Sequence, residues 1–146
     1  KHASGLLSGE IVAILAGPNP AEMRAGLHAA LEYMKNEAIW YSANADASIA
    51  FFPHLISRTG AFLSKVCDIP LGSPIAYLVA PPMEGLVALD AALKAATVRI
   101  AALTLPPSET NYSGAFMTGS QAACKAACDA FTAAVLEVAA CPIRCG

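Results

Sequence analysis

The chain has 146 residues, of which 56% are hydrophobic and only 14% are charged, and its net charge is −2. Its mean hydropathy of +0.53 is high for a soluble monomer, in which about a quarter of the residues are usually charged. A membrane-spanning helix needs about 20 nearly uncharged residues, and the longest apolar segment is interrupted by Lys125, Asp129 and Glu137. The composition therefore favours extensive protein–protein surfaces. Without a basic run, it does not favour nucleic acid as a partner.

The first 45 residues are predicted to form a strand followed by a helix. Glu10–Leu15 is an apolar run that ends at a Gly-Pro pair, a pattern typical of a short strand. Asn19 can cap a helix, Pro20 suits its first position, and Glu22 completes a capping box. We expect the apolar stripe of this helix to be buried; its members are Met23, Leu27, Leu31 and Met34.

Two short strands and a short helix are expected next. Ile39–Tyr41 and Ser48–Ser57 have strand composition, and Pro53 would confine the second strand to an edge or a bulge. A short helix, about Ala61–Asp68, follows Gly60 and precedes a segment broken by proline and glycine.

The segment between residues 75 and 111 is predicted to be a strand–helix–strand unit. Ile75–Val79 is rich in β-branched and aromatic residues, and a helix can begin near Pro82 because the first helical turn tolerates proline. Such a unit connects two strands of one sheet. The two apolar patterns are formed by Leu86, Leu89 and Leu93 in the helix, and by Val98, Ile100 and Ala102 in the strand.

A strand at Ala115–Thr118 and a long helix opened by Ser120 complete the pattern. This helix is rich in alanine, so it can lie close on a sheet. Helices packed on a sheet place the chain in the α/β or α+β class. We expect residues 1–45 to be the C-terminal part of one domain and residues 46–146 to be a complete second domain. The apolar stripe of the last helix consists of Cys124, Cys128, Phe131, Val135 and Val138.

The five cysteines do not predict a disulfide scaffold, because their number is odd and their density is low. A reduced, cytosolic protein is favoured instead. Cys124 and Cys128 lie one helical turn apart, but a zinc site needs about four ligands, so packing in the core is favoured over metal binding. The sequence contains no nucleophile elbow, phosphate-binding loop or dinucleotide fingerprint. We therefore expect no catalytic residues, no metal and no cofactor.

The loop PPSETN is the best candidate for a site. Ser108, Glu109, Thr110 and Asn111 place a carboxylate, two hydroxyls and an amide side by side. An ordinary capped turn has the same composition, and the residues alone favour that interpretation.

Several segments are long enough to compare as motifs: AYLVAPPMEGLVALDAALKAA, PPSETNYSGAF, TGSQAACKAACDAF, GEIVAILAGPNPAE and SRTGAFLSK. Together they resemble the shell proteins of bacterial microcompartments, and among these the ethanolamine-utilisation shell proteins. The resemblance implies circularly permuted tandem domains, each with a β-sheet flanked by helices. It also implies a homotrimer of hexagonal outline, a pseudohexamer that tiles with other shell proteins in a microcompartment shell in the bacterial cytoplasm. Because the chain begins KHASG without an initiator Met, an N-terminally truncated form is expected.

The resemblance further implies a pore for a small polar metabolite, with ethanolamine as the expected ligand. The matching positions are Glu10, Trp40, Thr110 and Asn111, and family members usually have Phe where this chain has Trp40. A carboxylate and hydroxyl groups suit an ammonium ion, and an aromatic ring adds cation–π attraction.

Lys94 has two interpretations. By resemblance it matches the lysine at the edge where neighbouring tiles meet, whereas by spacing it is a solvated helix lysine paired with Asp90. Two alternatives for the whole protein also stay open. One is a shell protein of a related compartment for ethanol or diol utilisation, and the other is a small-molecule-binding regulatory domain that does not tile.

Overall fold

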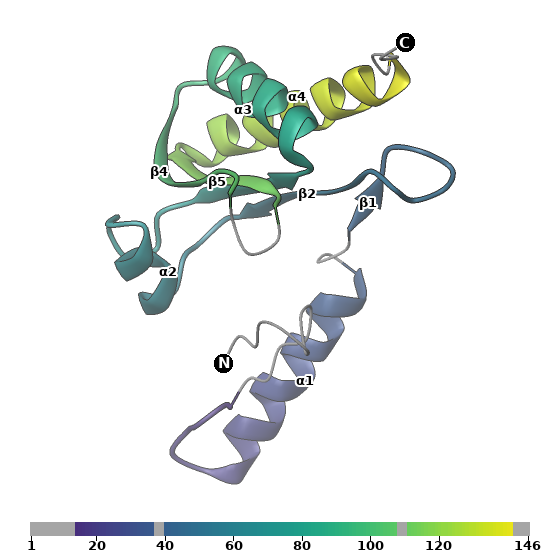
Figure 1. The fold of residues 1–146 in the computed structure, drawn as a ribbon. Helices are drawn as coiled ribbons and strands as arrows, with labels where there is room; N and C mark the ends of the chain where they lie inside the picture. The colour runs from purple at the N-terminus through teal and green to yellow at the C-terminus, as the bar shows by residue number, and fades with distance from the viewer. Residues whose placement is uncertain (1–13, 37–39, 108–110, 142–146) are drawn as a thin grey trace. The chain divides into compact units, whose positions relative to one another are not determined.

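The computed structural model describes residues 14–36, 40–107 and 111–141 (Figure 1). The chain divides into two compact units, residues 1–39 and 40–146. The assignment of these units to parts of two shell domains stays a prediction. In the described ranges, no helix is long and apolar enough to cross a membrane.

The first unit contains one described helix, α1 (Pro20–Asn36). It begins where the sequence predicts, at the Asn19 cap, although only half of a capping box is formed. The backbone N–H of Glu22 donates to Oδ1 of Asn19 at 2.9 Å. In addition, Nδ2 of Asn19 donates to Oε1 of Glu22 at 2.9 Å, so the two side chains hold each other while Asn19 satisfies one free backbone N–H at the helix start.

The predicted burial of the α1 stripe is wrong for the described chain. Leu27, Leu31 and Met34 are between 51% and 63% exposed. Among the described residues of this unit, Ile14 and Leu15 line a hollow beside Leu27, and Cδ2 of Leu15 lies beside Gly26. Periodicity identifies the apolar face of a helix but not what covers it. Most of the predicted strand Glu10–Leu15 lies outside the described residues, and its last two residues are not in a strand.

The second unit is built on a five-stranded sheet in the order β1-β2-β3-β5-β4, with every neighbouring pair antiparallel. Strand β5 lies between β3 and β4 and runs antiparallel to both, so β3 and β4 are parallel to each other. The strand–helix–strand unit therefore connects two strands of one sheet, as the sequence predicts. The strands are β1 (Tyr41–Ser42), β2 (Ala50–Ile56), β3 (Ile75–Ala80), β4 (Val98–Thr104) and β5 (Ser113–Gly119).

The proline in β2 lies where the sequence analysis expects it. Strand β1 pairs only with Ala50 and Phe51. Beyond these two residues β2 has no second described neighbour, so Pro53 occupies an edge segment where a missing N–H costs little.

Helices cover the two faces of the sheet unequally (Figure 1). Helices α3 (Pro82–Ala95) and α4 (Gln121–Ala140) lie together on one face, and the short α2 (Ala61–Val66) lies on the other. Ser120 caps α4 by accepting a hydrogen bond from the N–H of Ala123 at 3.1 Å. The α4 stripe is buried as predicted, apart from the half-buried Val138. This sheet with flanking helices confirms the predicted fold class.

The predicted stripe of α3 is only partly correct. Leu89 is buried, but Leu86 and Leu93 are exposed. Small residues form most of the buried face because they let the helix lie close to the sheet. At Gly85, an added Cβ would come within 2.7 Å of the Cβ of Ser113. The buried residues of α3 are Gly85, Ala88, Leu89 and Ala92.

Candidate functional site

A row of aromatic rings lies on the sheet face opposite α3 and α4. It follows from the alternation of side chains along a strand: Phe51 is buried in the core under the helices, whereas its neighbour Phe52 belongs to the row. Tyr77 stacks on Phe116 with ring centroids 4.4 Å apart, and Phe52 meets the ring of Tyr77 edge-on at 5.4 Å. The aromatic row consists of Trp40, Phe52, His54, Tyr77, Tyr112 and Phe116.

Trp40 lies at one end of the aromatic row and is 55% exposed. Its ring centroid is 5.5 Å from that of Phe52, with the planes inclined at 39°. On another side it meets Tyr112 at 5.8 Å, with the planes at 80° to one another. Offset and edge-to-face pairs of this kind are attractive, so the indole is held by two neighbours while about half of it stays accessible.

Asn111 lies next to Tyr112 in the chain and is exposed. Its φ of 56° is in the left-handed region, which asparagine tolerates better than most residues. The structure thus brings two of the predicted site residues, Trp40 and Asn111, to the same end of the aromatic row by way of Tyr112. Thr110 and Glu10 lie outside the described residues, so the convergence of all four stays a prediction.

A hollow of about 260 Å³ adjoins the row. Tyr112 lines it together with the stacked rings of Tyr77 and Phe116, and burial raises the pKa of Tyr77 above its ordinary value. Sequence reasoning missed these aromatic residues. The available signal was the placement of Tyr77 and Phe116 at positions that alternate with small or aliphatic core residues.

The two cysteines of α4 are core residues, as the sequence predicts. Cys124 is fully buried, and its Sγ lies 3.7 Å from the carbonyl oxygen of Pro74. Burial, together with the charge of Asp129, raises the pKa of the Cys128 thiol to about 12, so this thiol is protonated and unreactive near neutral pH. Among the described residues, no group of three or more His, Cys, Asp or Glu side chains could hold a metal ion.

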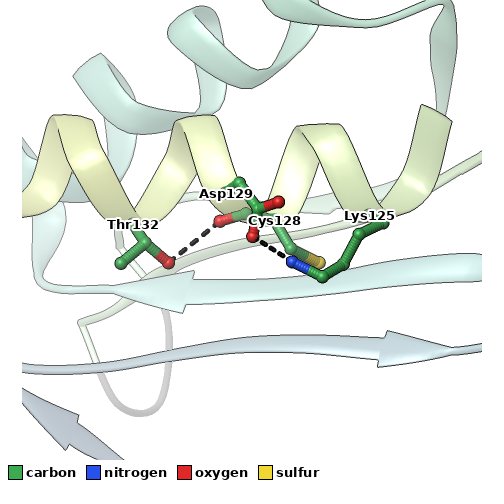
Figure 2. Close-up of polar contacts among 4 residues, drawn as sticks. All are labelled: Lys125, Cys128, Asp129 and Thr132. Carbon is green, nitrogen blue, oxygen red and sulfur yellow. Dashed lines mark hydrogen bonds and ion pairs between the residues drawn. The ribbon is translucent and has the colours of Figure 1, made fainter. Parts of the chain in front are cut away.

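A second hollow, of about 340 Å³, lies beside α4. Figure 2 shows its polar side: Lys125 forms an ion pair with Asp129, and the hydroxyl of Thr132 donates to the carbonyl oxygen of Cys128 at 2.9 Å. In the described part of the chain, every buried side-chain nitrogen or oxygen has a hydrogen-bond partner. The polar groups here form hydrogen bonds and an ion pair with one another. We therefore interpret this hollow as an ordinary helix surface and not as a binding site.

Lys94 lies in the last turn of α3 and is exposed. Its Nζ is 2.5 Å from Oδ2 of Asp90, one turn earlier. An exposed pair of this kind contributes at most about 1 kcal/mol to stability. The role of Lys94 at a tile edge stays a prediction.

The comparisons with known proteins point to one class of protein. Residues 79–142, from the end of β3 through α4, match the family model of the BMC domain. This matched segment is similar to BMC domains, and the sheet with flanking helices has the fold seen in solved bacterial microcompartment shell proteins.

Within this class the chain is similar to EutL along nearly its whole length. It is 55% identical over 143 residues to the bacterial microcompartment shell protein EutL of Escherichia coli (strain K12). This alignment covers 98% of the present chain and 65% of the E. coli protein. The identity to EutL of Clostridium perfringens (strain 13 / Type A) is 54%, over 97% of this chain and 65% of that protein. The chain therefore spans 65% of the length of these curated relatives.

Solved structures give the same result. The crystal structure of EutL from Leptotrichia buccalis matches with a TM-score of 0.85 and 57% identity, over 97% of this chain and 65% of that one. The trimeric shell protein PduB matches with a TM-score of 0.70 at 23% identity, over 84% of this chain and 55% of that one, which shows a common fold only.

Proposed function

We propose that the chain is a structural component of an ethanolamine-utilisation microcompartment shell in the bacterial cytoplasm. It assembles as a homotrimer of hexagonal outline, tiles with other shell proteins into a layer, and has no catalytic role. The observation that carries this proposal is the identity of 52–57% to EutL proteins over 97–98% of the chain.

The surface of the second unit supports an assembling protein. Met83, Leu86 and Val87 are exposed on α3, close in sequence to the exposed pair of Asp90 and Lys94. Around α2, Phe62 and Leu71 are also exposed, among the most exposed large apolar side chains of the chain. Exposed apolar side chains on both sides of the sheet are consistent with protein–protein contacts.

The proposed pore ligand is a small amine, for which ethanolamine is the expected molecule. In this proposal the carboxylate of Glu10 pairs with the ammonium group, and the accessible part of Trp40 adds cation–π attraction. Thr110 and Asn111 offer a hydroxyl and an amide to the polar end of the ligand. The location of Trp40 and Asn111 at one end of the aromatic row supports this arrangement.

Two alternatives are less well supported. The bacterial microcompartment shell protein PduB and EtuB of Clostridium kluyveri are only 23% and 20% identical to the chain, far below the value for EutL. A ligand-binding domain that does not tile would leave the apolar residues of α3 and α2 without a role.

Electron microscopy of the purified protein tests the proposal. A shell protein forms extended two-dimensional layers or co-assembles with other shell proteins of an ethanolamine compartment. A protein that stays dispersed under all conditions in which the EutL relatives assemble, and that is excluded from such shells, would contradict it.

A further inference from the structure

We infer that Tyr112 is a positioning residue that fixes the indole ring of Trp40 within the amine site. This inference rests on the site given under the proposed function and adds to it a residue that makes no direct contact with the ligand. Its role is to limit the orientations of an exposed aromatic side chain.

The first argument is the geometry around the indole. Trp40 precedes β1 and is 55% exposed, so its ring would be free to rotate if it had no neighbours. Phe52 contacts it at 5.5 Å with the planes inclined at 39°, and this tilted contact alone covers one side of the ring. Tyr112 meets it at 5.8 Å and 80°, and this second contact, nearly perpendicular to the indole plane, restricts rotation of the ring further.

The second argument is that Tyr112 is itself well anchored. It is half-buried and lines the hollow beside the aromatic row. The next residue, Ser113, is fully buried, pairs with Ala80 across the β3–β5 ladder, and donates from its hydroxyl to the carbonyl oxygen of Pro82 at 3.1 Å. The ring of Tyr112 therefore projects from backbone that the sheet and the start of α3 hold in place.

The third argument is chain continuity. Tyr112 directly follows Asn111, one of the polar residues of the proposed site. A single short segment thus supplies both a polar group for the ligand and the ring that orients Trp40. Tyr112 therefore determines how the amide of Asn111 and the indole of Trp40 are placed relative to each other. This placement decides whether both groups can reach one small ligand.

The chain offers a direct probe of this inference, because Trp40 is its only tryptophan. Fluorescence excited where tyrosine does not absorb reports on this ring alone. Removing the aromatic ring in Tyr112→Leu should lower the fluorescence anisotropy and make Trp40 more accessible to acrylamide. Tyr112→Phe keeps the ring and should behave as wild type. Phe116→Leu, which changes the row at a residue stacked on Tyr77 instead, is the matched control and should leave the emission unchanged.

Ethanolamine titration of the same variants gives the second measurement. One aromatic pair contributes about 0.5–1.5 kcal/mol. Loss of the pair between Tyr112 and Trp40 should therefore make Tyr112→Leu bind ethanolamine about two- to tenfold more weakly, whereas Tyr112→Phe should keep the wild-type affinity. If Tyr112→Leu does not fold, as judged by circular dichroism, Tyr112→Met replaces it, because methionine preserves much of the volume without a ring.

The outcomes separate the two proposals. If the anisotropy and the acrylamide quenching of Trp40 are unchanged in Tyr112→Leu and Tyr112→Met, the positioning role of Tyr112 is overturned. This holds whether or not ethanolamine binds. Mobile Trp40 with unchanged ethanolamine affinity would likewise overturn its role in the site. If wild type bound no ethanolamine but the ring-less variants still freed Trp40, the amine ligand would be refuted while the positioning contact would stand.

Discussion

The two faces of the sheet in residues 40–146 are covered in different ways. Beneath α3 and α4, small residues such as Ala88, Ala92 and Ala127 pack with Phe131 and are completely buried. On the opposite face the side chains are larger and aromatic, yet the short α2 covers only one end, around Ile75. The helix-covered face is complete within the described residues, whereas much of the aromatic face stays accessible.

This difference separates stability from function. The side chains on the helix-covered face are buried, so they contribute to stability and cannot contact a ligand. The accessible aromatic face contains Trp40 and adjoins Asn111, so the proposed ligand contacts and the indole that Tyr112 orients are all on the side that the helices do not cover. Substitutions on the two faces should therefore have different consequences.

The largest expected effect is on the helix-covered face. Phe131→Ala removes a fully buried ring and should lower the free energy of unfolding by about 3–5 kcal/mol. Phe116→Ala on the aromatic face removes a half-buried ring and should cost about 1–2 kcal/mol. Chemical denaturation of both variants measures the difference. Equal losses would contradict the assignment of the core to the helix-covered face.

Close approach of α3 to the sheet gives the next effect. Gly85→Ala places a methyl group within 2.7 Å of the Cβ of Ser113 and 3.1 Å of the carbonyl oxygen of Ala80, and such overpacking costs about 1–3 kcal/mol. Gly60→Ala is the control, because its added methyl group meets nothing within 4 Å; it should cost less than about 1 kcal/mol. Thermal denaturation of both variants checks this, and a neutral Gly85→Ala would mean that α3 lies further from the sheet.

On the ligand side, Glu10→Gln should weaken ethanolamine binding by about 1–3 kcal/mol, because it removes the charge but keeps the shape. Thr110→Val loses only a neutral hydroxyl and should cost less. Calorimetric titration decides between these values. Equal binding to wild type and Glu10→Gln would refute the amine-selective site and leave the shell proposal intact.

The smallest effect on folding is expected at the exposed ion pairs. Lys94→Ala should change stability by less than about 1 kcal/mol but reduce the extended layers seen by electron microscopy. Lys125→Ala removes another exposed lysine that is also paired one helical turn away, with Asp129, and should leave the layers unchanged. If both variants tile as wild type does, Lys94 is an ordinary solvated lysine.

Much of the fold follows from local sequence signals. The capping box of Asn19 and Glu22 and the Ser120 cap predict where helices begin, because capping depends on residues within one turn. The composition of Ile75–Val79 correctly predicts a strand, and the cysteine-containing stripe of α4 correctly predicts buried positions. The resemblance of long motifs correctly indicates the similarity to EutL shell proteins.

What the sequence could not predict depends on distant neighbours. Burial of the α1 stripe requires a covering element, and none lies among the described residues of its unit. On α3, glycine and alanine replace two of the three expected leucines at the contact, because helix–sheet distance is a tertiary property. For the site, Trp40 and Asn111 were found by resemblance, but Tyr112 was missed because only the three-dimensional contact with Trp40 gives it a role.

The central claim is that this chain belongs to an assembling shell tile, and the oligomeric state of the protein expressed from its complete reading frame tests this most directly. Sedimentation velocity at micromolar concentration measures the mass without a surface or a lattice. The shell proposal predicts a trimer that persists on dilution through the micromolar range, since its interfaces are expected to be large and apolar. A folded, monodisperse monomer under the same conditions would contradict it.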